Sequence, residues 1–146
     1  MGLIWRTDLE TRQRRVISPW PKYMMGNSAE DMEERFPWTY PIVFSPVDAT
    51  ALYTASQHLF RSTDEGESWE RISPDLTRAD PETLGPSGGP IVLDQDGPEV
   101  YATVFTIAPS EQDARVLWAG SDDGLVHITR DGGAEWRNVT PKAMVR

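Results

Sequence analysis

The sequence predicts an all-β fold, and two observations support this prediction. Short apolar segments alternate with turns, and the chain of 146 residues contains 12 Pro and 11 Gly, which favours many short strands over long helices. In addition, a segment in the first half of the chain recurs in the second half with the same internal spacing. Such self-similarity indicates an architecture built from repeated supersecondary units.

The repeat covers residues 52–74 and 117–141, which align when a two-residue insertion is placed at Asp122–Asp123–Gly124. Both copies contain the pattern Ser/Thr-x-Asp-x-Gly-x-x-Trp, followed by a β-branched residue and Ser/Thr-Pro. The pattern is formed by Ser62, Asp64, Gly66 and Trp69 in the first copy and by Thr129, Asp131, Gly133 and Trp136 in the second. Two copies with identical spacing predict two equivalent hairpins.

Folding alone explains the residues of this pattern. The aspartates suit a tight turn because a carboxylate can accept hydrogen bonds from backbone N–H groups two or three residues later. The glycines supply the positive φ that such a turn requires, and each tryptophan begins the returning strand with a large apolar ring. We therefore interpret the aspartates as structural rather than catalytic, and we expect Trp69 and Trp136 to be substantially buried.

The pattern resembles the Asp-box, or BNR, repeat of sialidases, some endoglucanases and sortilin-type receptors. The wider segments 38–46, 72–78, 87–91 and 120–126 resemble large bacterial sortilin-like proteins that are often labelled glycosyl hydrolases. The resemblance implies a β-propeller, in which the Asp-box joins the third and fourth strands of a blade. It also implies an exported bacterial parent protein, periplasmic or extracellular, whose remaining blades would be partners of this chain.

We therefore expect a β-propeller fragment with two four-stranded antiparallel blades and part of a preceding blade. The expected units are an outer hairpin (1–18), an aromatic-rich inter-blade loop (19–41), a blade (42–73), a second inter-blade loop (74–100), a second blade (101–141) and a tail (142–146). The first blade would use Ile42–Ser45, Ala51–Ala55, Leu59–Ser62 and Trp69–Ile72. The second would use Ala102–Ile107, Val116–Ala119, Leu125–Thr129 and Trp136–Val139. Helical turns are expected after Ser28 and at Pro74.

In a meander of this kind, both long loops lie on the same face as the turns at His58 and at Asp122–Asp123, and the Asp-box turns lie on the opposite face. The ligand-binding candidates on the loop-bearing face are Trp20, Trp38, Tyr40, His58, Asp122 and Asp123. Each has a structural alternative. The aromatic residues could pack against neighbouring blades, and the polar residues could serve their own turns.

Composition excludes several kinds of function. The chain has no cysteine, which rules out a thiolate nucleophile and Cys-ligated zinc, and His58 and His127 lack a zinc-binding spacing. We therefore expect no metal and no cofactor. A formal net charge of −9 argues against nucleic-acid binding. No apolar run approaches the ~20 residues of a membrane span, and no signal peptide is visible in this chain.

The favoured hypothesis is a non-catalytic segment that presents a binding face to a carbohydrate or protein ligand. The alternative is part of a glycoside hydrolase, sialidase-like or endoglucanase-like, with catalytic residues partly outside this chain. Such an enzyme needs two carboxylates that flank the scissile bond, and no pattern pairs two of the acidic residues on the relevant face, which are Asp94, Asp96, Glu99, Asp122 and Asp123. A purely structural scaffold is a third possibility.

Overall fold

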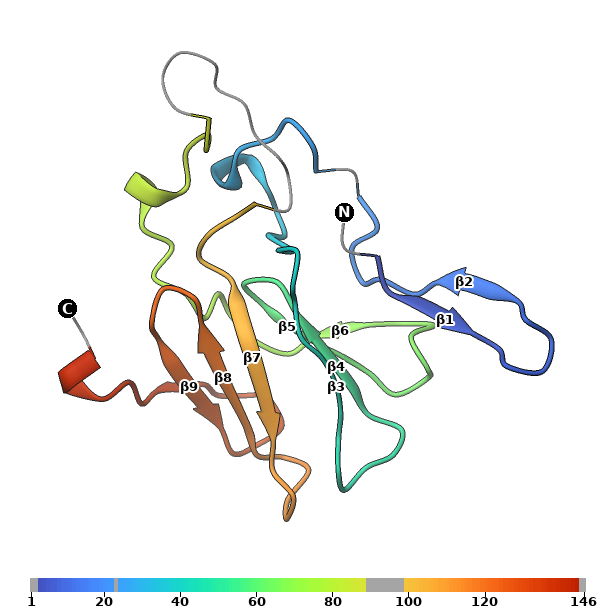
Figure 1. Cartoon of the computed structure of the whole chain (residues 1–146). Helices are drawn as coiled ribbons and strands as arrows, with labels where there is room; N and C mark the ends of the chain where they lie inside the picture. The colour runs from blue at the N-terminus through green and yellow to red at the C-terminus, as the bar shows by residue number, and fades with distance from the viewer. Residues whose placement is uncertain (1–2, 23, 89–98, 145–146) are drawn as a thin grey trace.

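The structure, a computed structural model, describes residues 3–22, 24–88 and 99–144. Over these residues the chain is all-β, as the sequence predicts, with three antiparallel sheets of two, four and four strands. The helical elements of the described residues are three short 3-10 turns: η1 (Ala29–Asp31), η2 (Pro81–Thr83) and η3 (Lys142–Met144). The first hairpin extends away from the two larger sheets (Figure 1).

Each sheet is a meander in which every strand pairs with the next one in the chain. The first sheet contains β1 (Trp5–Thr7) and β2 (Arg14–Val16). The second contains β3 (Ile42–Phe44), β4 (Leu52–Ala55), β5 (Leu59–Ser62) and β6 (Glu70–Arg71). The third contains β7 (Val104–Pro109), β8 (Leu117–Ser121), β9 (Val126–Thr129) and β10 (Arg137–Asn138). The strands begin and end within one or two residues of the predicted positions.

Three hairpins, β1–β2, β5–β6 and β9–β10, end in the same hydrogen bond. The acceptor in each hairpin is the hydroxyl of a Ser or Thr that follows the second strand. The donor is the backbone N–H of the residue that begins the first strand or directly precedes it. The pairs are Ile4 with Ser18 at 2.7 Å, Leu59 with Ser73 at 2.8 Å, and Val126 with Thr140 at 2.9 Å. The first hairpin is therefore equivalent to the β5–β6 and β9–β10 hairpins, although its turn lacks their Gly and Trp.

The main core lies between the second and third sheets. It consists of buried residues from both sheets and from the segment after β6, namely Ala51, Tyr53, Ala55, Leu59, Ile72, Leu76, Val104, Ile107, Leu117 and Ala119. A smaller apolar cluster joins the first hairpin to the second sheet through Ile4, Ile17 and Leu52. Because burial of one such side chain stabilises the fold by about 1.5–3 kcal/mol, the larger cluster contributes most of the sheet-to-sheet stability.

The two tryptophans of the repeated pattern, Trp69 and Trp136, connect successive hairpins. The indole Nε1–H of Trp69 donates to the backbone carbonyl of Ile17 at 2.6 Å, and that of Trp136 donates to the carbonyl of Ile72 at 2.8 Å. Ile17 and Ile72 occupy the same position in their hairpins, directly before the capping Ser. Both rings are partly buried rather than fully buried, because one side packs on an apolar cluster while the other remains at the surface.

Replacing Trp136 with phenylalanine should lower the free energy of unfolding by about 1 kcal/mol, because the ring is retained but the Ile72 carbonyl loses its donor. Urea denaturation of the purified chain measures this difference. Trp118→Phe is the matched control, since Trp118 is 42% exposed and should change stability by less than about 0.5 kcal/mol. Equal losses in the two variants would contradict a role for the inter-hairpin bond.

The expected helical turns differ from those observed. Residues 74–77 are not helical, because the Asp75 carboxylate accepts hydrogen bonds from the Thr77 backbone N–H and hydroxyl and so closes an Asx turn instead. A 3-10 turn forms later, at η2. After Ser28 a single turn forms, η1, and the Ser28 hydroxyl donates to the Asp31 carboxylate at 2.8 Å rather than capping the backbone.

Candidate functional site

Both long loops leave the sheets at one end, which we call the loop face. It contains the β4–β5 turn at residues 56–58 and the β8–β9 turn at 122–125, together with the segments 17–41 and 72–103 as far as they are described. In Figure 1, η1 and η2 lie above the second and third sheets on this side. The turns of the repeated pattern, at 63–69 and 130–136, lie at the opposite ends of their strands.

The turns of the repeated pattern are closed by their own side chains. The Asp64 carboxylate accepts from the Ser68 backbone N–H at 2.9 Å, and the Asp131 carboxylate accepts from the Glu135 N–H at 3.0 Å. Hydrogen bonds from Ser68 and Ser62 lower the pKa of Asp64 to about 2. These bonds hold both carboxylates ionised within their turns, away from the loop face.

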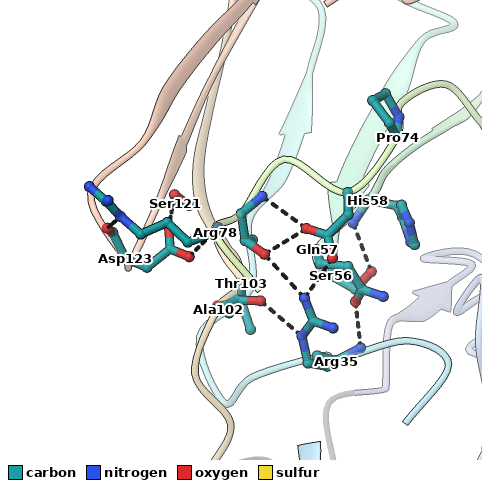
Figure 2. A network of polar contacts seen from close by, with 12 residues as sticks. Arg35, Ser56, Gln57, His58, Pro74, Arg78, Ala102, Thr103, Ser121 and Asp123 are labelled. Atoms are coloured by element: carbon teal, nitrogen blue, oxygen red, sulfur yellow. Dashed lines mark hydrogen bonds and ion pairs between the residues drawn. The ribbon is translucent and has the colours of Figure 1, made fainter. Parts of the chain in front are cut away.

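Arg35 is the centre of a polar network on the loop face. Its side chain is 7% exposed, and Nε donates to the Ala102 carbonyl at 3.0 Å while Nη2 donates to the Asp75 carboxylate at 2.9 Å. Its backbone N–H donates to Oε1 of Gln57 at 2.8 Å. Figure 2 shows Arg35 between Ala102 and the Gln57 turn. The network therefore ties both long loops to the β4–β5 turn.

Next to Arg35, Glu34 is a buried carboxylate with three polar neighbours. Its side chain is 3% exposed, and it accepts from the Ser56 hydroxyl at 2.5 Å. His58 Nδ1 lies 3.0 Å from Oε2, and Arg71 Nη1 lies 3.5 Å from Oε1. A buried charge requires compensation, and these three neighbours supply it. Glu34 therefore helps to hold the first long loop against the β4–β5 turn and β6.

Asp122 and Asp123, two of the ligand-binding candidates, make hydrogen bonds within the protein. The backbone N–H and the hydroxyl of Thr103 both donate to the Asp122 carboxylate at 2.9 Å. The Arg78 N–H donates to the Asp123 carboxylate at 2.6 Å, and Arg78 Nε donates to the Asp123 carbonyl at 2.8 Å (Figure 2). Burial raises the pKa of Asp122 despite the bonds from Thr103. Both residues hold the second long loop against β8–β9.

The three aromatic candidates differ in exposure. Trp20 and Tyr40 pack partly buried against Met24 and Phe36, and burial raises the pKa of Tyr40 to about 12. Trp38, in contrast, is 58% exposed. A hollow of about 210 Å³ lies beside Trp20 and is lined in part by Glu34. Trp38 is therefore the aromatic candidate with the most ring surface available for stacking.

Several residues of the site were not expected from the sequence. Glu34, Arg35 and Arg78 look like ordinary charged loop residues, and their partners are 22 to 67 positions away in the chain. Asp94 and Asp96, which were expected on this face, lie outside the described residues. Tyr23, in the aromatic-rich loop, also lies outside them.

Among the described residues, no group of three or more acidic, His or Cys side chains is arranged to hold a metal ion. No helix of the described part is long and apolar enough to cross a membrane.

Compared with models of known protein families and with curated protein sequences, the chain has no match.

Proposed function

We propose that this chain is part of an Asp-box β-propeller that binds a ligand on its loop face without catalysing a reaction. The observation that carries the proposal is the threefold equivalence of the hairpins. Each ends in the same hydroxyl bond, and each Asp-box Trp bonds to the hairpin before it. A radial repeat requires that successive hairpins contact one another through equivalent hydrogen bonds of this kind.

The loop face supports a binding role. Its loops are held by buried polar networks around Glu34 and Arg35, so the surface above them is preorganised, which reduces the entropy lost on binding. Trp38, on the segment that leads into β3, is 58% exposed. A flat, exposed aromatic ring with a rigid support suits stacking against a sugar ring or an apolar side chain. A carbohydrate is the ligand class we favour.

The neighbouring carboxylates favour binding over hydrolysis. A glycoside hydrolase needs one carboxyl group free to donate a proton and a second one free to attack or to activate water. Asp122 and Asp123 accept hydrogen bonds from Thr103 and Arg78, and Glu34 is buried among Ser56, His58 and Arg71. These groups act as loop anchors in our proposal.

A glycan panel tests the proposal directly. Wild-type chain should bind at least one oligosaccharide class, and Trp38→Ala should weaken that binding about tenfold or more, equivalent to about 1.4 kcal/mol or more. Trp118→Ala is the matched control, because Trp118 is also exposed but lies on β8. Equal loss in both variants, or no binding by wild type, would contradict the proposal. Hydrolysis of a panel member would favour the glycosidase alternative.

A further inference from the structure

A groove of about 830 Å³ lies between the first hairpin and the second sheet. Its lining is mainly apolar and includes Trp5 on β1 and Ile42 and Phe44 on β3. These three side chains are 49%, 50% and 65% exposed. Large apolar side chains exposed together around one concavity mark an interaction surface rather than an ordinary solvent-facing patch.

One edge of β1 borders this groove, and none of the described strands pairs with it. Among the described strands, β1 pairs with β2 alone, whereas β5 pairs with both β4 and β6, and β9 pairs with both β8 and β10. The shared hydroxyl bonds make β1, β5 and β9 equivalent. The free edge of β1 therefore corresponds to the edge that β4 occupies in the second sheet and β8 in the third.

Ile42 in the second sheet and Ile107 in the third sheet are equivalent residues that differ in exposure. Ile42 pairs with Thr54, and Ile107 pairs with Ala119 at the same place in the third sheet. Ile107 is 6% exposed because it packs in the main core with Tyr53 and Ala55 of β4, while Ile42 is 50% exposed. A strand placed beside β1 as β4 is placed beside β5 would cover Ile42 in the same way.

The two strands that occupy this position have a common sequence. β4 and the residue after it read Leu52-Tyr-Thr-Ala-Ser, and β8 reads Leu117-Trp-Ala-Gly-Ser. Both place an aromatic residue second, small residues third and fourth, and Ser last. In the second sheet, Tyr53 and Ala55 point to the third sheet, and Leu52 points to the first hairpin. An occupant of the groove would thus turn its aromatic and second small residue toward β3.

We infer that this groove binds an extended peptide segment with the pattern Leu-aromatic-small-small-Ser, antiparallel to β1. In the β4 register, the Leu lies opposite Thr7 and the second small residue lies opposite Ile4. Backbone hydrogen bonds along the edge supply affinity, and the apolar groove selects the aromatic side chain, as in other cases of strand addition. The inference rests on the repeat assembly of the proposed function and is independent of the loop-face ligand.

The test uses a fluorescent peptide with the sequence of residues 50–57, which covers β4, and the whole chain as receptor. We expect saturable binding by anisotropy, and a weakening of tenfold or more for an analogue with Asp in place of the Tyr. Phe44→Lys and Ile42→Lys should each weaken binding about tenfold. Both side chains are exposed, so both variants should fold. Trp118→Lys is the control on the other exposed flank and should bind as wild type does.

Failure of the peptide to saturate, or equal binding by Phe44→Lys and wild type, would overturn the inference. So would a dimer that the peptide does not dissociate, because a second copy would then cover the groove. The result is separable from the loop-face test. Trp38→Ala should leave peptide binding unchanged, and Phe44→Lys should leave glycan binding unchanged.

Discussion

Gly133→Ala should lower the free energy of unfolding by about 2–5 kcal/mol, the sum of a backbone and a steric cost. Gly133 has φ +108, a conformation that costs an L-residue about 1–2 kcal/mol or more. A Cβ at this position would also lie 2.5 Å from the carbonyl oxygen of Ile72. Because the obstacle is backbone, it cannot rotate away, and overpacking of this kind costs about 1–3 kcal/mol. Denaturation in urea measures the loss.

Gly132 provides the matched control. Its φ is +79 and a Cβ built there has no heavy atom within 4 Å, so Gly132→Ala carries only the backbone cost of about 1–2 kcal/mol. The difference between the two variants isolates the contact between the β9–β10 turn and the preceding hairpin. If the free energy of unfolding falls equally in both variants, the approach of Gly133 to Ile72 is not tight. The contacts between successive hairpins would then be weaker than we propose.

The strands were predictable because local sequence determines them. Alternating apolar residues and turn-forming Asp, Gly and Pro occur at the observed strand ends, and each strand pairs with its neighbour in sequence, so no long-range choice of partner was required. The repeat also predicts the equivalence of the β5–β6 and β9–β10 hairpins. Within the described residues the three sheets do not close on one another, and the propeller belongs to the function we propose.

The contacts between hairpins were not predictable in the same way. The Ser/Thr-x-Asp-x-Gly-x-x-Trp pattern predicts that Trp69 and Trp136 face an apolar surface, but it does not specify an acceptor for the indole N–H. The acceptors, Ile17 and Ile72, are 52 and 64 residues away in the chain. The sequence predicts substantial burial of the two rings, and the structure has both rings partly buried, because each lies along the edge of the preceding hairpin.

The side-chain contacts of the loop face were even less predictable from the sequence. Residue type in the expected turns predicts Asp122, Asp123 and His58 as candidates. It does not predict their counterparts, because Thr103, Arg78 and Glu34 carry no local pattern that distinguishes them from other loop residues. Side-chain networks between distant segments depend on loop conformation, which neither periodicity nor turn propensity determines.

The largest effect on the loop face should come from Arg35→Ala, which we expect to lower the free energy of unfolding by about 2–4 kcal/mol. The variant removes a buried cation from Asp75 and leaves the Ala102 carbonyl without its donor. Loss of one member of a buried ion pair costs about 3–5 kcal/mol, and we take a lower value because the Asp75 side chain is 32% exposed. Chemical denaturation of wild type and variant gives the difference.

Arg61→Ala is the control for loss of an arginine as such. Arg61 donates to Glu70 at 2.7 Å, but both side chains are substantially exposed, so its removal should cost no more than about 1 kcal/mol. Arg35→Lys should be intermediate, because one ammonium cannot reproduce the guanidinium contacts with Ala102, Asp75 and Thr77 together. If Arg35→Ala and Arg61→Ala are equally mild, the two long loops are held by packing alone. In that case, the preorganised loop face on which ligand binding depends would have to be explained without Arg35.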